Sequence, residues 1–316
     1  MTDERIPERA LRADPPAGMG EENWFAGATS LFRRRYALDP TGADVAVLGV
    51  PFDQAVTNRP GTRFGPRAVR AASSALAWPG GPWRWREDPF ATLDVVDTGD
   101  VPYDTGDPAA FAATVEAHAA RLIATGARLL ALGGDHFVSY PLIKAHAARY
   151  GPLALVHFDA HSDTWREGAR RIDHGTMFFH AIEEGLIDPA RSIQVGIRSG
   201  NTESHGVAII DADAALDAPP AETAAAIRAR VGEGPAYLTF DIDVLDPAFA
   251  PGTGTPVCGG LTTNRAERIL CALAGLSFVG MDLVEVSPPY DHADITALAA
   301  ATMALDMIAL LGAARG

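Results

Sequence analysis

The sequence predicts a three-layer α/β/α fold built around a mostly parallel, eight-stranded sheet. Two observations lead to this prediction. Apolar runs of strand length alternate along the chain with helix-like segments, as they do in proteins with parallel sheets. These runs are apolar at nearly every position, which is typical of strands that helices cover on both faces.

The predicted elements follow one another regularly after residue 40. Strands are expected at 45–50, 93–96, 129–132, 153–158, 193–197, 207–210, 236–240 and 278–283. Helices are expected at 66–77, 108–125, 137–150, 176–184, 222–231, 263–274 and 294–311. No linker-like break separates them, so residues 1–316 are predicted to form a single domain, with 1–22 as an extended N-terminal arm.

Composition and charge exclude several classes of protein. The net charge of −14 argues against nucleic acid or an anionic membrane as a main partner. The only cysteines, Cys258 and Cys271, cannot form a disulfide framework, which favours the reducing cytoplasm. The charged N-terminus lacks the apolar core of a signal peptide, and no uninterrupted apolar run is long enough to span a bilayer.

A group of potential metal ligands follows the predicted strand 153–158. Asp159, His161 and Asp163 occupy every second position, and alternate side chains of an extended strand point to the same face. A lone aspartate in a loop is usually only solvated. Carboxylates beside a buried strand are costly without a positive partner, so the spacing predicts a metal site.

A second pair of carboxylates, Asp241 and Asp243, repeats this pattern after the predicted strand 236–240. The same spacing occurs in phosphatases that use an aspartate nucleophile, but their chemistry usually requires a downstream lysine. No lysine follows Lys144, the only one in the chain, so the metal interpretation is preferred.

His136 follows the predicted strand 129–132 and completes a candidate set of two histidines and four aspartates. Alternatively, His136 simply begins a helix that Asp135 caps. All of these residues lie at the carboxyl ends of predicted parallel strands, where open α/β sheets build their sites. An oxygen-rich set with some imidazole suits Mn²⁺ better than structural zinc, and six ligands suit two bridged ions. Such a pair activates a shared water, which predicts metal-assisted hydrolysis.

Several longer segments match a known family. The most specific are GGDH at 133–136, DAHSD at 159–163, DHGTMF at 173–178 and DID at 241–243, and the match extends through 59–66, 248–256 and 281–288. They resemble the signature sequences of the ureohydrolases, the family of arginases and agmatinases, over nearly everything from residue 23 to the end. Segments 173–178 and 183–189 look most like bacterial agmatinases, and an arginase-like fold is expected.

The resemblance implies a binuclear manganese site and the residues that act beside it. One Mn²⁺ would bind His136, Asp159, Asp163 and Asp241, and the other would bind Asp159, His161, Asp241 and Asp243, with Asp159 and Asp241 bridging. Glu285 corresponds to the carboxylate that receives the substrate guanidinium, a pair that can be charge-assisted and bidentate. His174 corresponds to the proton-transfer histidine, and Asp163 would also steady the tetrahedral intermediate.

The implied reaction releases urea from a guanidino compound. Agmatine, which would give putrescine, is the expected substrate, and guanidinobutyrate or guanidinopropionate is the alternative. Arg170 and Arg171 would favour such a carboxylate tail if they pointed inward. Segments 57–58 and 199–205 are expected near the entrance. The family also implies a homo-oligomer, either a trimer or a hexamer.

Two hypotheses of other classes are kept for comparison. A non-catalytic binding protein on the same fold would have lost a ligand, Glu285 or His174, and none of these is lost. A single-zinc amide hydrolase is disfavoured by the four aspartates. His157 lies on the same face as the ligands, but the set is already complete, so His157 is expected to support the ligands or the core.

Overall fold

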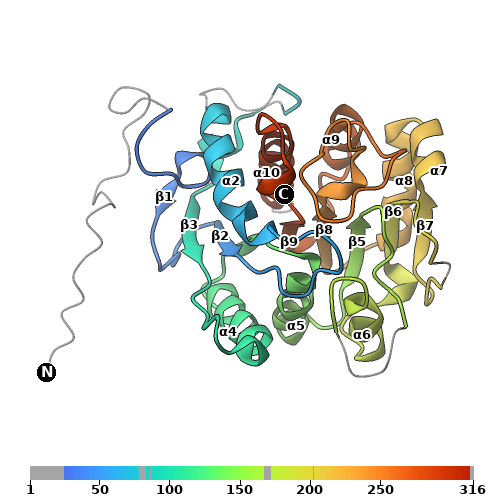
Figure 1. Cartoon of the computed structure of the whole chain (residues 1–316), viewed down its shortest axis with the longest axis horizontal. Coiled ribbons are helices and arrows are strands. Elements are labelled where there is room, and N and C mark those ends of the chain that lie inside the picture. Colours follow the sequence, from blue (N-terminus) through green and yellow to red (C-terminus); the bar gives the residue numbers. More distant parts are fainter. Residues whose placement is uncertain (1–24, 78–82, 86, 167–171, 202, 314–316) are drawn as a thin grey trace, which may run out of the picture.

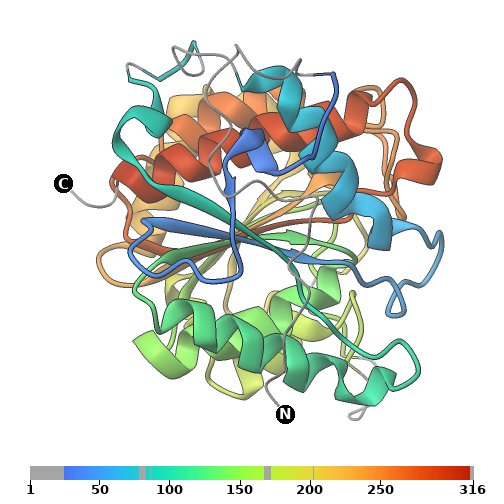
Figure 2. The ribbon, with the colours of Figure 1, turned by 90° about the vertical axis from the view of Figure 1, so that its left-hand side faces the viewer.

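One parallel sheet lies at the centre of the computed structural model, which describes residues 25–77, 83–85, 87–166, 172–201 and 203–313. Its strands run in the order β1-β3-β2-β4-β9-β8-β5-β6-β7, and every neighbouring pair is parallel. Helices cover both faces of the sheet (Figures 1 and 2). The predicted three-layer α/β/α class is therefore confirmed.

The sheet has nine strands instead of the predicted eight. They are β1 (Arg35–Tyr36), β2 (Val45–Val50), β3 (Val95–Asp100), β4 (Arg128–Gly133), β5 (Ala154–Phe158), β6 (Ile193–Ile197), β7 (Ala208–Asp211), β8 (Ala236–Asp241) and β9 (Phe278–Val284). The additional strand β1 has two residues and pairs with β3 at the edge of the sheet. It has no apolar run, so the pattern could not reveal it.

All seven predicted helices are present, with ends shifted by a few residues. The helices are α2 (Gly65–Ser73), α3 (Pro89–Thr92), α4 (Phe111–Ile123), α5 (Ser139–Tyr150), α6 (Met177–Glu183), α7 (Ala212–Asp217), α8 (Pro220–Val231), α9 (Thr263–Cys271) and α10 (Ile295–Ala313). Helices α4, α5 and α6 cover one face, and α2, α8, α9 and α10 cover the other (Figure 1). The two helices that were not predicted, α3 and α7, are too short to show a periodic pattern.

The apolar core consists of two clusters, one on each face of the sheet. In β4, Leu130 and Leu132 belong to one cluster, whereas Leu129 and Ala131 belong to the other. Since successive side chains of a strand point to opposite faces, both faces need apolar residues. This explains why the strands appear as continuous apolar runs in the sequence.

Helix α10 is the one helix among the described residues that is long and apolar enough to cross a membrane, judged by length and composition only. The sequence predicts that no uninterrupted apolar run spans a bilayer, and Asp306 does interrupt this helix. Its most apolar window is 78% buried inside the fold. A buried core helix meets the same criteria, and α10 packs against α2, α9 and β9 as such a helix.

Asp306 is a buried carboxyl group in the middle of α10. Its Oδ1 accepts a hydrogen bond of 2.8 Å from the indole Nε1 of Trp85. Burial raises the pKa of Asp306 to about 7, although the bond from Trp85 acts in the opposite direction. In the unfolded chain this carboxyl has a pKa near 4. Between pH 4 and 7 the folded state therefore holds a proton that the unfolded state has released, and the free energy of unfolding falls as the pH rises.

We therefore expect Asp306→Asn to stabilise the protein more strongly at alkaline than at acidic pH. The amide keeps an acceptor for Trp85 and removes the cost of burying an ionised carboxylate. The gain in unfolding free energy should be roughly 3–4 kcal/mol at pH 8 and less than half of that at pH 5. Urea denaturation at the two pH values measures it, and an equal gain at both would contradict the explanation.

Candidate metal centre and active site

Four adjacent strands in the middle of the sheet bring the predicted site residues together. In sheet order these are β4, β9, β8 and β5. His136 follows β4, Glu285 follows β9, Asp241 ends β8 and Asp159 follows β5. The carboxyl ends of parallel strands meet at one edge, so residues more than a hundred positions apart in the chain become neighbours.

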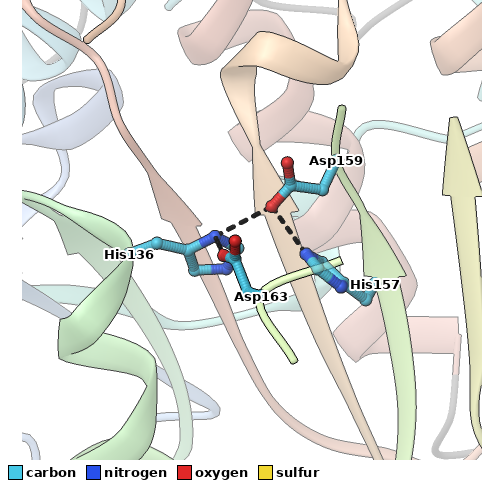
Figure 3. A group of neighbouring side chains, drawn as sticks. All are labelled: His136, His157, Asp159 and Asp163. Atoms are coloured by element: carbon cyan, nitrogen blue, oxygen red, sulfur yellow. Dashed lines mark hydrogen bonds and ion pairs between the residues drawn. The ribbon is translucent and has the colours of Figure 1, made fainter. Parts of the chain in front are cut away.

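His136 faces three of the predicted aspartate ligands. Its Nδ1 lies 3.0 Å from Oδ2 of Asp159, 2.9 Å from Oδ2 of Asp163 and 3.2 Å from Oδ2 of Asp241. Figure 3 shows the first two of these contacts. All four side chains are buried.

The hydrogen-bond partner of Nε2, the second ring nitrogen of His136, shows that Nε2 carries a proton. Nε2 lies 2.8 Å from Oγ1 of Thr239, and the hydroxyl of Thr239 donates to Oδ1 of Asp282. Because this hydroxyl proton is already used, Thr239 accepts a hydrogen bond from Nε2–H. Nδ1 then faces three carboxylates, an arrangement that requires either a proton or a metal ion at this nitrogen.

The second group of ligands forms around His161. Its Nδ1 lies 3.3 Å from Oδ1 of Asp159 and 3.1 Å from Oδ2 of Asp243. Asp159 therefore turns one carboxylate oxygen toward each histidine and belongs to both groups. Oδ1 of Asp241 accepts the backbone N–H of Asp243 at 2.8 Å. A bridging role for Asp241 stays a prediction.

The charges of this cluster fit a pair of divalent metal ions. Burial raises the pKa of Asp241 well above its ordinary value, and Asp243 and Asp159 raise it further. Burial alone would also raise the pKa of Asp159, but the neighbouring histidines lower it well below its ordinary value. Buried carboxylates at such distances cannot all ionise without added positive charge. Their oxygen atoms and two imidazoles are a ligand set that suits oxygen-preferring divalent ions.

A cavity of about 260 Å³ opens beside the cluster. It is lined by Thr57, His136, His161, Asp163, Trp165, Asp173, His174, Gly175, Thr176, Asp241, Thr255 and Glu285. Of the predicted site residues, Asp159 and Asp243 do not line this cavity. The cavity thus joins both predicted groups of ligands to His174 and Glu285, the two residues expected to act on the substrate.

Glu285 is a buried carboxylate with one occupied and one unoccupied oxygen. Its Oε1 accepts the backbone N–H of His136 at 2.9 Å and contacts Nδ1 of His174 at 3.0 Å. Among the described residues, Oε2 has no hydrogen-bond partner. Glu285 and Asp163 also adopt positive φ angles of 63° and 52°. Such backbone strain in non-glycine residues concentrates at functional sites.

Thr57 holds the other side of the His174 ring. Its backbone N–H donates to Nε2 of His174 at 3.0 Å, and its Oγ1 lies 2.8 Å from the same nitrogen. Burial alone would lower the pKa of His174, but the hydrogen bond and charge of Glu285 outweigh it and raise the pKa to about 9. When the ring of His174 is neutral, Nε2 can accept the N–H of Thr57. When the ring is protonated, Nε2 can donate to the hydroxyl of Thr57. Nε2 is therefore the position at which His174 can gain or lose a proton.

His136 does begin a short helical turn with Asp135 at its N-cap position, but the side chain of Asp135 makes no capping hydrogen bond, so the predicted cap is wrong. The short helical turn from His136 to Val138 has no side-chain cap. Oδ2 of Asp135 instead accepts the backbone N–H of Ala55 at 2.9 Å. This bond ties the loop that carries Thr57 to the end of β4.

Several residues around the site were not predicted from the sequence. Thr239 supports His136, and Thr255 donates to Oδ2 of Asp243 at 3.2 Å. A polar residue inside an apolar strand, such as Thr239, was the available signal. The described residues of 199–205 do not line the cavity, and Arg170 and Arg171 lie outside the described residues.

Comparisons with known proteins agree with this geometry. The sequence model of the arginase family matches residues 43–309. An agmatinase of Chromobacterium violaceum is 49% identical over 98% of this chain and 97% of its own length. A crystal structure described as a hypothetical agmatinase from Burkholderia thailandensis has a TM-score of 0.89 and 50% identity, covering 92% of both chains. The proclavaminate amidino hydrolase of Streptomyces clavuligerus has a TM-score of 0.87 and 38% identity, covering 93% of this chain and 100% of its own. The chain therefore belongs to the arginase family.

Proposed function

We propose that this protein hydrolyses agmatine to putrescine and urea at a centre that holds two Mn²⁺ ions. The relatives named agmatinase are about half identical to it over most of both chains. The observation that carries the proposal is the unpaired oxygen of Glu285, a buried acceptor at the wall of a cavity that four of the six predicted metal ligands also line.

The guanidinium end of the substrate would bind Glu285. A guanidinium group presents N–H donors in a planar fork, and a buried carboxylate oxygen without a partner is a matching acceptor. A Cβ atom added at Gly254 would lie 3.5 Å from Oε2 of Glu285, in van der Waals contact with this oxygen. The carbon of the bound guanidinium would then lie beside His136 and Asp163 in the same cavity.

The tail of the substrate is proposed to carry a positive charge. Asp163 and Asp241 would be used by the metal ions and Glu285 by the guanidinium, which leaves Asp173 as the remaining acidic residue of the lining. No lysine or arginine occurs among the described residues that line the cavity, so the carboxylate tail of a guanidino acid would find no cationic partner there, and the amine tail of agmatine is favoured. Trp165 adds an aromatic surface to which an alkyl chain or ammonium group can bind.

The chain supplies ligands, orientation and a proton carrier for this reaction. When bound, the metal pair would supply an activated water molecule at neutral pH. The ligands would be His136, His161 and the four aspartates Asp159, Asp163, Asp241 and Asp243. Glu285 would orient the guanidinium, and His174 would donate a proton from Nε2 to the departing amine.

Urea release from a panel of substrates tests the proposal. The Mn²⁺-loaded protein is assayed with agmatine, guanidinobutyrate, guanidinopropionate, arginine and guanidine, and a chelated sample serves as the control. We expect the highest kcat/KM for agmatine and no urea from the chelated sample. A preference for guanidinobutyrate or guanidinopropionate would establish the alternative substrate class, and no urea from any compound would overturn the proposal.

We expect His174→Asn to reduce kcat about 10²- to 10⁴-fold while KM and bound manganese change little. The amide nitrogen of asparagine takes the place of Nδ1 and keeps the contact with Glu285, but no group remains to carry a proton at the Nε2 position. Steady-state kinetics and metal analysis test this. An unchanged kcat would exclude His174 as the proton carrier.

Other properties of the protein stay predictions. We propose that it works in the cytoplasm as a single domain, and that it assembles into a trimer or hexamer. Size-exclusion chromatography with light scattering would measure the assembly state.

A further inference from the structure

Gln194 is a fully buried amide in the otherwise apolar strand β6, at its second position. Its Nε2 lies 2.6 Å from the carbonyl oxygen of Ser162 and 3.1 Å from Nδ1 of His157. A carbonyl oxygen can only accept, so the group that faces Ser162 must be the amide nitrogen. This contact fixes the orientation of the amide and directs its second N–H to His157.

The amide of Gln194 thereby determines where the ring proton of His157 lies. Nδ1 accepts a hydrogen bond, so the proton is on Nε2. That nitrogen lies 2.7 Å from Oδ2 of Asp159, in the arrangement seen in Figure 3. A nitrogen that carries a proton has no lone pair for a metal, so His157 is a hydrogen-bond donor and not an additional ligand.

Without Gln194, His157 would be difficult to distinguish from a ligand. Its nitrogen lies close enough to His136, Asp159 and Asp163 to belong to the same potential metal-binding group. For His157 to bind a metal through Nε2, Nδ1 would have to carry the proton and find an acceptor. The amide oxygen of Gln194 would then have to turn toward His157, and another group would have to donate to Ser162.

We propose that Gln194 is a positioning residue of the metal centre, which acts through His157 on the shared ligand Asp159. Hydrogen bonds then reach both oxygens of this carboxylate: Nε2 of His157 donates to Oδ2, and the backbone N–H of His161 donates to Oδ1 at 2.5 Å. These donors hold the carboxylate so that one oxygen faces each histidine ligand. Partners that orient metal ligands in this way typically change metal affinity 10- to 100-fold when they are removed.

The first experiment locates the ring proton directly. Metal-free protein is labelled with ¹⁵N-histidine, and the signals of His157 are identified by their loss in His157→Phe. We expect a proton on Nε2 and a lone pair on Nδ1. A proton on Nδ1 would overturn the inference, and the measurement needs neither activity nor metal.

The second experiment measures Mn²⁺ binding by calorimetric titration. Gln194→Leu and His157→Phe are expected to bind Mn²⁺ about 10- to 100-fold more weakly than the unsubstituted protein. His157→Gln should keep most of the affinity, because its amide nitrogen can occupy the position of Nε2 and donate to Asp159. Thr223→Val is the matched control. It also removes a buried polar group, in α8, and should leave the affinity unchanged.

The proposed role of Gln194 rests on the proposed metal centre. The Mn²⁺ titration distinguishes a failure of the metal centre from a failure of the role of Gln194 alone. If the unsubstituted protein binds no Mn²⁺, the proposed function fails. If it binds two ions and Gln194→Leu binds them equally tightly, only the role of Gln194 is refuted. Equal weakening in His157→Gln and His157→Phe would also refute it, because the hydrogen bond would then not be the cause.

Discussion

Replacing Glu285 by glutamine is expected to reduce kcat/KM for agmatine about 10²- to 10³-fold while the protein still binds two Mn²⁺ ions. The estimate corresponds to the loss of one partner from a buried charge pair. The reason lies in how the two oxygens are used. Oε1 is occupied by His136 and His174, so the guanidinium depends on Oε2. An amide has no negative charge, and its nitrogen would present donors to a group that itself only donates.

Steady-state kinetics together with metal analysis test this prediction. Metal binding should persist, because Glu285 contacts the ligand His136 only through a backbone N–H. Glu222→Gln, an exposed substitution in α8 that makes the same change of charge, should behave like the unsubstituted protein. Normal turnover by Glu285→Gln would remove Glu285 from the proposed role. Loss of manganese would show instead that it supports the metal site.

The fold class and most of the site could be predicted because both depend on local patterns. Continuous apolar runs predict strands buried on both faces, and the alternation at 159–163 predicts ligands on one face. The order of the strands was not predictable in this way. β9 and β8 lie between β4 and β5, although both come later in the chain. This insertion brings Glu285 and Asp241 next to His136, and it depends on long-range packing.

The supporting residues of the site were harder to predict than the ligands. Gln194 and Thr239 are single polar residues in apolar strands, and their roles depend on the strand that lies beside them. Asp97 similarly lies inside β3, where its carboxylate pairs with the guanidinium of Arg70 at 2.8 Å. The predicted strand 93–96 ended before this residue, because a buried ion pair gives no apolar signal.

Replacing Asp159 by asparagine is expected to have the largest effect on the metal centre. Asp159 is the carboxylate that faces both His136 and His161, so its loss should weaken both metal positions together. We expect fewer than one Mn²⁺ per chain under conditions in which the unsubstituted protein binds two. Turnover should fall by about 10³-fold or more, since positioning and charge stabilisation are lost at once.

Asp243→Asn is the matched comparison, because Asp243 contacts His161 and not His136 among the described ion pairs. It should weaken one metal position and leave the other near its original affinity. Metal analysis and Mn²⁺ titration of the two variants therefore distinguish a shared ligand from one that serves a single ion. If Asp159→Asn and Asp243→Asn lost the same single ion, Asp159 would not be the bridge, and Asp241 would be left as the carboxylate that links the two groups.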